Sequence, residues 1–190
     1  MGEPLRPGEV HTCEDYESTR GAERRAAAEA QRERRVRLGE RLTLVFESRE
    51  TIRLSLEELL RAERIGDATR VAAKIDDFNA FVPQRGQLGA TLYVEASDAA
   101  ELGAALADLE GVERAVYLEV AGRRYGGDTL QGETADDLAA ASFIAFPLPA
   151  DACDAWRAGG VVVVAGVAHP SCSERAELTT AQRSAIGADL

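Results

Sequence analysis

One carboxylate lies where an apolar side chain is expected. The segment from Thr51 to Ile65 has the spacing of an amphipathic helix, which advances about 100° per residue. Four apolar side chains then share one face, namely Ile52, Leu56, Leu59 and Leu60. Glu63 falls in the middle of that face. Such a carboxylate binds a ligand or handles a proton at the mouth of a cleft, or forms an internal ion pair, or lies on a last turn that has left the core.

Candidate partners for Glu63 are arginines and a histidine. Arg49 is the arginine expected in an internal ion pair, if the role of Glu63 is structural. In the functional interpretation, Glu63 and His169 are the catalytic candidates, while Arg49 and Arg64 bind an anionic small molecule. The sequence therefore contains a candidate acid/base group and candidate positively charged partners. It does not determine whether the role of Glu63 is structural or functional.

Two pairs of histidine and cysteine have the atoms for a tetrahedral zinc site. They are His11 with Cys13, and His169 with Cys172. Their spacings do not match a zinc finger or ribbon, so we expect no metal and no cofactor. The nucleotide-binding GxGxxG and GxxxxGK[ST] patterns, HExxH and CxxC are all missing from the sequence. The sequence motifs therefore do not indicate any class of enzyme.

Arginines gather before the first predicted strand. The stretch from Arg20 to Arg37 holds seven arginines and three glutamates, and nearly all its residues favour helix. It is either a solvated helix face with Glu–Arg pairs or a docking surface for an acidic protein partner. No aromatic residues are interleaved to stack on bases, so nucleic acid is disfavoured.

Composition narrows the class of protein. The chain has 190 residues, a formal net charge of −11 and three cysteines. A net negative charge disfavours a general nucleic-acid binder, and an odd number of cysteines favours a reducing compartment. No apolar run approaches the ~20 residues of a membrane span, and the N-terminus has no secretory signal. We therefore expect a cytoplasmic protein that does not enter a membrane.

Periodicity and caps predict an α+β fold. Strands are predicted at 42–46, 88–96, 115–120, 142–146 and 161–167, with a loop at 122–137. Helices are predicted at 20–37, 51–65 and 67–78, from Asp98 to Gly111, from Pro149 to Gly159, and after Thr179. From residue 88 onward the order of elements matches a ferredoxin-like (βαββαβ) core, with both helices on one face of a single four-stranded sheet.

This pattern divides the chain into three parts of one compact unit. Residues 1–18 are predicted to be an irregular arm, residues 19–84 a helical layer with one extra strand, and residues 85–190 the ferredoxin-like core.

The block from Leu42 to Ile65, LTLVFESRETIRLSLEELLRAERI, resembles a bacterial family of unknown function, number 3501. The Arg-rich helix before it, the segment from Phe78 to Pro83 and the sequence around His169 are similar too. The resemblance implies a cytosolic protein in a redox or iron-linked setting, with no activity to carry over. The residues that match the family's motifs are Glu47, Arg49, Glu58, Arg61, Glu63, Arg64, Asn79 and His169, of which Glu47 and Asn79 join the ligand-binding candidates.

Two functions follow from these observations. We expect an accessory or binding protein that acts with a protein partner through the stretch from Arg20 to Arg37. Formation of a homodimer is a further expectation. The alternative is a small enzyme or ligand-binding domain that uses Glu63 on an anionic small molecule.

Overall fold

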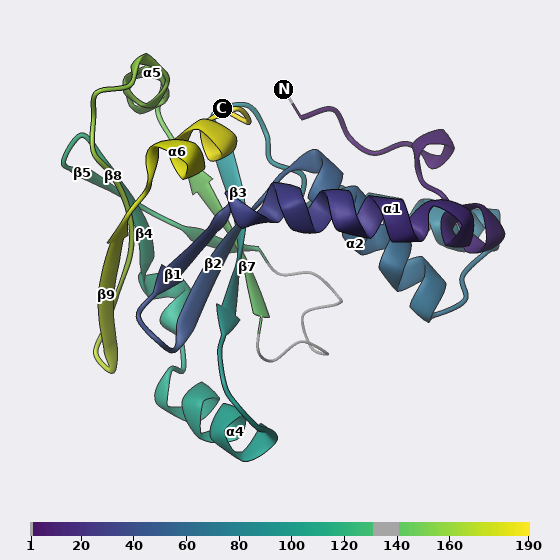
Figure 1. Cartoon of the computed structure of the whole chain (residues 1–190), viewed down its shortest axis with the longest axis horizontal. Helices are drawn as coiled ribbons and strands as arrows, with labels where there is room; N and C mark the ends of the chain where they lie inside the picture. The colour runs from purple at the N-terminus through teal and green to yellow at the C-terminus, as the bar shows by residue number, and fades with distance from the viewer. Residues whose placement is uncertain (1, 131–140) are drawn as a thin grey trace.

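The computed structural model describes residues 2–130 and 141–190, apart from the side chains of residues 13 and 14 (Figure 1). The helices are η1 (Pro7–Glu9), α1 (Cys13–Arg32), α2 (Arg49–Ala62), α3 (Ala68–Asn79), α4 (Ala99–Asp108), η2 (Val112–Ala115), α5 (Ala150–Ala158) and α6 (Thr180–Gly187). The strands are β1 (Arg35–Leu38), β2 (Leu42–Glu47), β3 (Gln87–Val94), β4 (Val116–Val120), β5 (Arg123–Gly126), β6 (Asp128–Leu130), β7 (Ala141–Pro147), β8 (Val163–His169) and β9 (Cys172–Glu177).

The strands form two antiparallel sheets. One has the order β1-β2-β3-β7-β6 and the other the order β5-β4-β8-β9. In β3, Leu88, Ala90 and Leu92 alternate with residues on the opposite face, so they point together toward the second sheet. The main hydrophobic core contains these three side chains together with Leu118 and Ala165 of the second sheet. The two sheets therefore cover each other's apolar faces.

The α+β class is confirmed, but the predicted single ferredoxin-like sheet does not form. Of the four strands expected in it, β3 and β7 pair in one sheet, and β4 and β8 pair in the other. Within α4, only Ala105 is buried, so this helix cannot cover a sheet face, and it projects from the body in Figure 1. Because the helix leaves that face open, the second sheet packs there instead.

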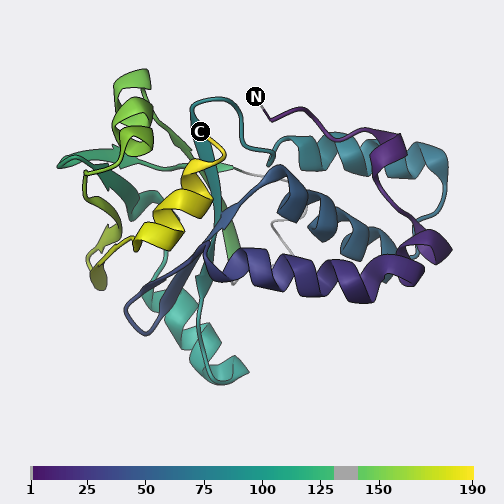
Figure 2. The ribbon, with the colours of Figure 1, turned by 45° about the horizontal axis from the view of Figure 1, so that its top comes forward.

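The helices α1, α2 and α3 form a layer beside the five-stranded sheet (Figure 2). A second apolar cluster lies within this layer, around Ile52, Leu56 and Leu60 of α2. Leu5 and Val10, from the segment before α1, are buried in the same cluster. The predicted irregular arm over residues 1–18 is thus wrong in two respects, since α1 begins at Cys13 and the part before it is anchored in the core.

Other predicted elements differ from the observed ones where pairing with a distant strand determines the local structure. The Arg-rich stretch is not one helix, because α1 ends at Arg32 and residues 35–38 pair with β2 as β1. Part of the predicted loop at 122–137 is a hairpin of β5 with β4 and a short strand β6, and its residues 131–137 lie outside the described residues. Strand β9 was not predicted. Within the described ranges, the structure holds no helix with both the length and the apolar character that crossing a membrane requires.

Candidate functional site

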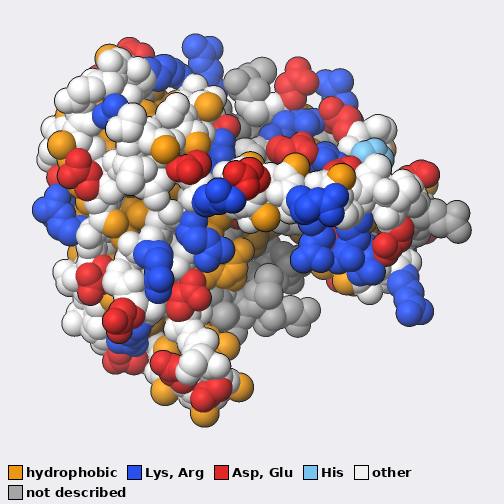
Figure 3. All heavy atoms as spheres, viewed as in Figure 1, with side chains coloured by type: hydrophobic (Ala, Val, Ile, Leu, Met, Phe, Trp, Pro, Cys, Tyr) orange, Lys and Arg blue, Asp and Glu red, His pale blue; other side chains and the backbone are white. Residues whose placement is uncertain are grey.

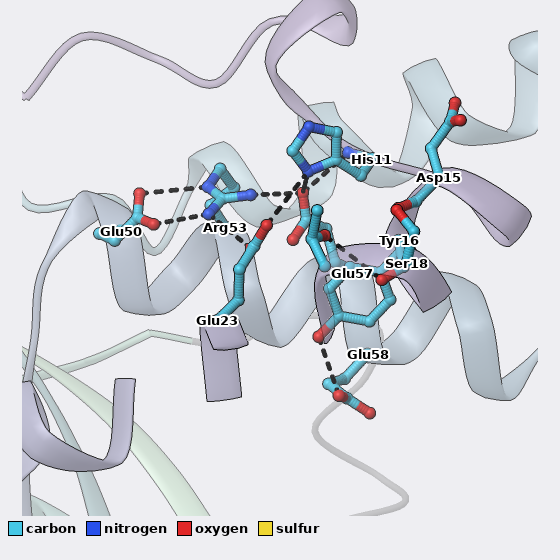
Figure 4. Close-up of polar contacts among 10 residues, drawn as sticks. His11, Asp15, Tyr16, Ser18, Glu23, Glu50, Arg53, Glu57 and Glu58 are labelled. Atoms are coloured by element: carbon cyan, nitrogen blue, oxygen red, sulfur yellow. Dashed lines mark hydrogen bonds and ion pairs between the residues drawn. The ribbon is translucent and has the colours of Figure 1, made fainter. Parts of the chain in front are cut away.

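The polar cluster of interest lies between α1, α2 and the segment before α1 (Figure 4). It consists of His11, Glu23, Glu50, Arg53 and Glu57, and we call it the His11–Glu57 cluster. Glu50, Arg53 and Glu57 follow one another at helical spacings of three and four residues along α2. Glu23 comes from α1, which covers that face of α2, and His11 comes from the segment that leads into α1.

Glu57 is the centre of the cluster. Its side chain is fully buried. One oxygen, Oε1, accepts a hydrogen bond from the backbone N–H of His11 at 2.8 Å and another from Arg53 Nη1 at 2.5 Å. The other oxygen, Oε2, is buried without a hydrogen-bond partner in the described part of the chain. Burial raises the pKa of Glu57, although His11 and Arg53 act in the opposite direction.

Arg53 joins three carboxylates. It donates to Glu50 through Nε at 3.1 Å and through Nη2 at 2.5 Å, and Nη2 also donates to Glu23 Oε2 at 2.9 Å. The hydrogen bonds that Arg53 donates to Glu50 and Glu23 raise the pKa of Arg53, so it stays protonated. Burial acts to raise the pKa of Glu23, but hydrogen bonds from Arg53 and Thr19, together with the nearby charges of Arg53 and His11, outweigh it and the pKa is lowered.

Three side chains of the cluster have metal-ligating atoms that lie close together. The Nδ1 atom of His11 lies 3.4 Å from Glu57 Oε1 and 3.6 Å from Glu23 Oε1. One ligand atom from each of the three residues lies within 4.8 Å of the other two. In the described part of the chain, this is the one group of three or more His, Cys, Asp or Glu side chains with such an arrangement.

The pairing of α1 with α2 continues beside the cluster. Glu58 accepts hydrogen bonds from Arg20 at 2.8 and 3.1 Å and from the buried Tyr16 hydroxyl at 2.8 Å. Arg61 forms an ion pair with Glu17 of α1. Two of the residues matching family motifs, Glu58 and Arg61, therefore attach α1 to α2.

Glu63 does not occupy the position that the sequence predicted. The helix α2 ends at Ala62 and Glu63 is its exposed C-cap, while the next residue, Arg64, has a φ of 53° and is also exposed. The chain turns back at Ile65, whose N–H donates to Leu60 O at 2.8 Å and whose side chain is buried. Of the interpretations of Glu63, the structure shows the one in which the last turn has left the core, and no internal ion pair with Arg49 forms.

The other predicted site residues lie in separate places. Arg49 is the first residue of α2, about 20 Å along the helix axis from Glu63, and it donates to Glu3 O at 2.7 Å and pairs with Glu9 at 2.6 Å. Asn79 accepts from the N–H of Leu5 at 2.6 Å and donates to Leu5 O at 3.2 Å. Both residues therefore hold the N-terminal segment in place.

Glu47 and His169 are also apart from the cluster. Glu47 is buried and accepts hydrogen bonds from the hydroxyls of Thr51 at 2.5 Å and Thr91 at 2.6 Å. His169, at the end of β8, has its Nε2 atom 3.1 Å from Glu110 O, and Cys172 opens β9. The side chain of Cys13 lies outside the described residues. Among the described side chains of the two His/Cys pairs, only His11 belongs to the group of ligating side chains above.

The Arg-rich stretch is largely neutralised by carboxylates. Among its seven arginines, five take part in ion pairs with acidic residues, namely Arg20, Arg24, Arg32, Arg34 and Arg35. On the face that Figure 3 shows, basic side chains gather over the middle of α1 and acidic side chains lie toward its ends. The ion pairs favour a solvated face with Glu–Arg pairs over a continuous basic docking surface.

Glu23, Glu50, Arg53 and Glu57 were not among the predicted site residues. Helical spacing places Glu57 on the side of α2 away from the apolar stripe, and α1 covers that side. The available signal was the spacing of Glu50, Arg53 and Glu57 together with a preceding helix rich in charges.

Comparisons with known proteins give a family and one solved structure. A family model described as "Protein of unknown function (DUF3501)" matches residues 4–190. The fold is similar to the crystal structure of a novel protein of unknown function from Burkholderia pseudomallei K96243, with a TM-score of 0.90 and 28% sequence identity over 99% of this chain and 100% of that chain. A search of curated proteins returned no match.

Proposed function

The chain belongs to the DUF3501 family of proteins of unknown function, and from its side-chain geometry we propose that it is a binding protein for a divalent transition-metal ion. The ligands are His11, Glu23 and Glu57. The observation that carries the proposal is the close approach of one nitrogen and two carboxylates. One of these carboxylates, Glu57, is buried, and its second oxygen, Oε2, has no hydrogen-bond partner among the described residues.

The spacing of the ligand atoms fits an ion. Two ligand atoms about 2.1 Å from a metal, at a tetrahedral angle, lie about 3.4 Å from each other. The Nδ1 atom of His11 lies 3.4 and 3.6 Å from its two carboxylate neighbours. Small side-chain rotations therefore suffice to place all three atoms around one ion. The His11 side chain is 47% exposed, so an ion can reach the site from solvent and keep water in a remaining position.

The charge of the cluster also favours a cation. Glu57 is fully buried, and Arg53 is shared among three carboxylates, so it does not fully compensate any one of them. A buried carboxylate that is incompletely paired is costly. A divalent ion would supply the missing positive charge next to the Glu57 carboxylate.

Arg53 does not have to leave the cluster when an ion binds. Its two hydrogen bonds to Glu50 involve atoms that the proposed ion does not need. Arg53 can turn away from Glu57 and Glu23 and keep Glu50 as its counter-ion. The side chain thus neutralises the cluster in the absence of metal and yields its place to the ion.

The ligand set selects a class of ion. One imidazole nitrogen with two carboxylates suits Fe²⁺, Mn²⁺ or Zn²⁺ better than Mg²⁺ or Ca²⁺, which prefer oxygen ligands alone. Fe²⁺ is the choice that agrees with the iron-linked setting implied by the family resemblance. In this proposal the chain is an accessory protein that holds such an ion, and its protein partner and homodimer formation stay predictions.

The test is stoichiometric metal binding by the whole chain. Apo-protein is titrated by isothermal titration calorimetry with Mn²⁺, with Zn²⁺ and, under anaerobic conditions, with Fe²⁺; Mg²⁺ is the comparison. We expect one equivalent of a transition metal to bind. Thermal unfolding should shift upward, because an ion at ~100 times its Kd stabilises the fold by about 2.7 kcal/mol.

Variants of the exposed and half-buried ligands locate the ion. His11→Ala and Glu23→Gln should each weaken binding by about tenfold or more. Glu29→Gln is the matched control, because Glu29 is an exposed glutamate of the same helix that pairs only with Arg32 among the described residues. Absence of stoichiometric binding, or equal affinity in the two ligand variants and the control, would overturn the proposal.

A further inference from the structure

The helices α5 and α6 lie on the other side of the molecule from the helical layer (Figures 1 and 2). Residues in and next to these two helices line a hollow of about 410 Å³. We call it the α5–α6 pocket. Its volume is within the range of small-molecule sites, about 300–1,000 Å³. The lining residues are Trp156, Arg157, Gly159, Thr180, Arg183, Ser184, Gly187 and Ala188.

Helical spacing builds one wall of the pocket. Thr180, Arg183, Ser184 and Gly187 lie at intervals of three and four residues, so they share one face of α6. Ile186, outside that set, is fully buried in the core. The helix therefore turns its apolar side to the core and two hydroxyls and a guanidinium to the pocket.

Close packing holds the pocket's tryptophan in position. The indole N–H of Trp156 donates to Arg183 O at 2.9 Å. A Cβ atom on Gly187 would lie 2.4 Å from Trp156 Nε1, so only glycine allows this approach. Trp156 is the single tryptophan of the chain.

The charge of the pocket is opposite to that of the chain. The whole chain carries −11, yet two arginines and no aspartate or glutamate line this hollow. Arg183 is half-buried, and its Nη1 donates to Val161 O at 2.7 Å, which fixes the guanidinium. In the described residues Arg183 has no carboxylate within ion-pair distance, whereas Arg34 has one and Arg53 has three. Among the same residues, Arg157 pairs only with Asp154, at 3.4 Å, and the Asp154 side chain is 77% exposed.

We propose that the α5–α6 pocket binds a small phosphate-bearing anion of the phosphate monoester class. Arg183 and Arg157 supply the positive charge, since a guanidinium matches the geometry of phosphate oxygens. The hydroxyls of Thr180 and Ser184 donate to the remaining oxygens. The volume exceeds that of a phosphate group alone, so the remainder of the pocket, beside Trp156 and Ala188, receives the organic part of the ligand.

This inference is independent of the proposed metal site. It uses residues of α5, α6 and their C-caps, and no residue of the His11–Glu57 cluster lines the pocket. Loss of metal binding would leave it standing, and loss of anion binding would leave the metal proposal standing.

The experiment uses the tryptophan that the pocket contains. Fluorescence of Trp156 is recorded while the full chain is titrated with inorganic phosphate, pyrophosphate and glycerol 3-phosphate, with potassium chloride as the matched-salt blank. Calorimetry on the same samples detects any binding that leaves the emission unchanged. We expect saturable binding of the phosphate compounds and none of chloride.

Variants assign the binding to the pocket. Arg157→Gln and Arg183→Gln should each weaken binding by about tenfold or more. Arg70→Gln is the control, because Arg70 is an exposed arginine of α3 with no ion pair among the described residues, and it should bind as the parent does. Because Arg157 is exposed, its variant is decisive even where Arg183→Gln fails to fold. No saturable binding by either method, or equal binding by Arg157→Gln and Arg70→Gln, would overturn the proposal.

Discussion

Replacing Glu47 by glutamine should change how the stability of the protein depends on pH. Glu47 lies in the five-stranded sheet, is 5% exposed and accepts two hydrogen bonds, both from threonine hydroxyls. Its pKa is raised above the ordinary 4.5, mainly by burial. Glu47→Gln removes the titrating group and keeps nearly the same shape.

The sign and size of the effect follow from proton linkage. Between pH 4.5 and the raised pKa, the folded chain keeps a proton on Glu47 that the unfolded chain has lost. Its stabilising contribution is therefore complete below pH 4.5 and is lost as the pH rises through the folded-state pKa. Over that window, the free energy of unfolding falls by up to about 1.4 kcal/mol per pH unit.

Glutamine imitates the protonated carboxyl, because it offers one acceptor oxygen and a donor to the two threonine hydroxyls. The two proteins should therefore agree within about 1 kcal/mol at pH 4. As the pH rises, Glu47→Gln should become the more stable of the two, and the difference should stop growing above the folded-state pKa of Glu47.

Urea unfolding at a series of pH values measures this difference. Trp156, which is 3% exposed, reports unfolding by fluorescence, and circular dichroism checks that the transition is shared. Glu63→Gln is the control, since Glu63 is exposed, and it should track the parent. The reasoning is refuted if the parent and Glu47→Gln give parallel curves, or if Glu47→Gln is the less stable protein at pH 8.

Three further substitutions test the packing described above. Tyr16→Phe removes the hydroxyl that donates to Glu58 and should lower the free energy of unfolding by about 1–2 kcal/mol in urea titrations; an unchanged midpoint would contradict a contribution from this bond. Asn79→Ala removes both hydrogen bonds to the N-terminal segment, so limited proteolysis should cleave residues 2–12 faster while the sheets stay protected, and equal cleavage rates would argue against the anchor. Gly187→Ala should displace Trp156, with a shift of its emission and a loss of about 1–3 kcal/mol by calorimetry, whereas an unshifted spectrum would show that α6 accommodates the methyl group.

Features set by neighbouring residues could be predicted from the sequence. Asp98 and Thr179 accept hydrogen bonds from backbone N–H groups at the starts of α4 and α6, and Ser48 does so for α2. Each of these caps depends on residues two or three positions away, so local chemistry suffices. The α+β class follows from the same local signals.

Features set by distant contacts could not be predicted in this way. The division of the strands between two sheets depends on which apolar faces meet, and strand order along the chain does not contain that information. The position of Glu63 required knowing that α2 ends at Ala62, and no glycine or proline marks this end until Gly66. Glu57 lies opposite the apolar stripe of α2, and helical periodicity alone does not reveal that α1 docks there and removes it from water.

The attachment of α1 to α2 has a consequence for how the molecule comes apart. Within α1, Tyr16 is the sole buried hydrophobic residue among those described, and the helix is attached to α2 by Arg20–Glu58, Glu23–Arg53 and Glu17–Arg61. Salt screens ion pairs, and sulfate in addition strengthens apolar packing. Concentrated sodium sulfate should thus weaken the attachment of α1 to α2 while it strengthens the packing between the two sheets. The attachment of α1 is therefore mainly electrostatic, whereas the rest of the molecule is held by apolar packing. An ion bound by both Glu23 of α1 and Glu57 of α2 would cross-link the two helices and oppose the detachment of α1.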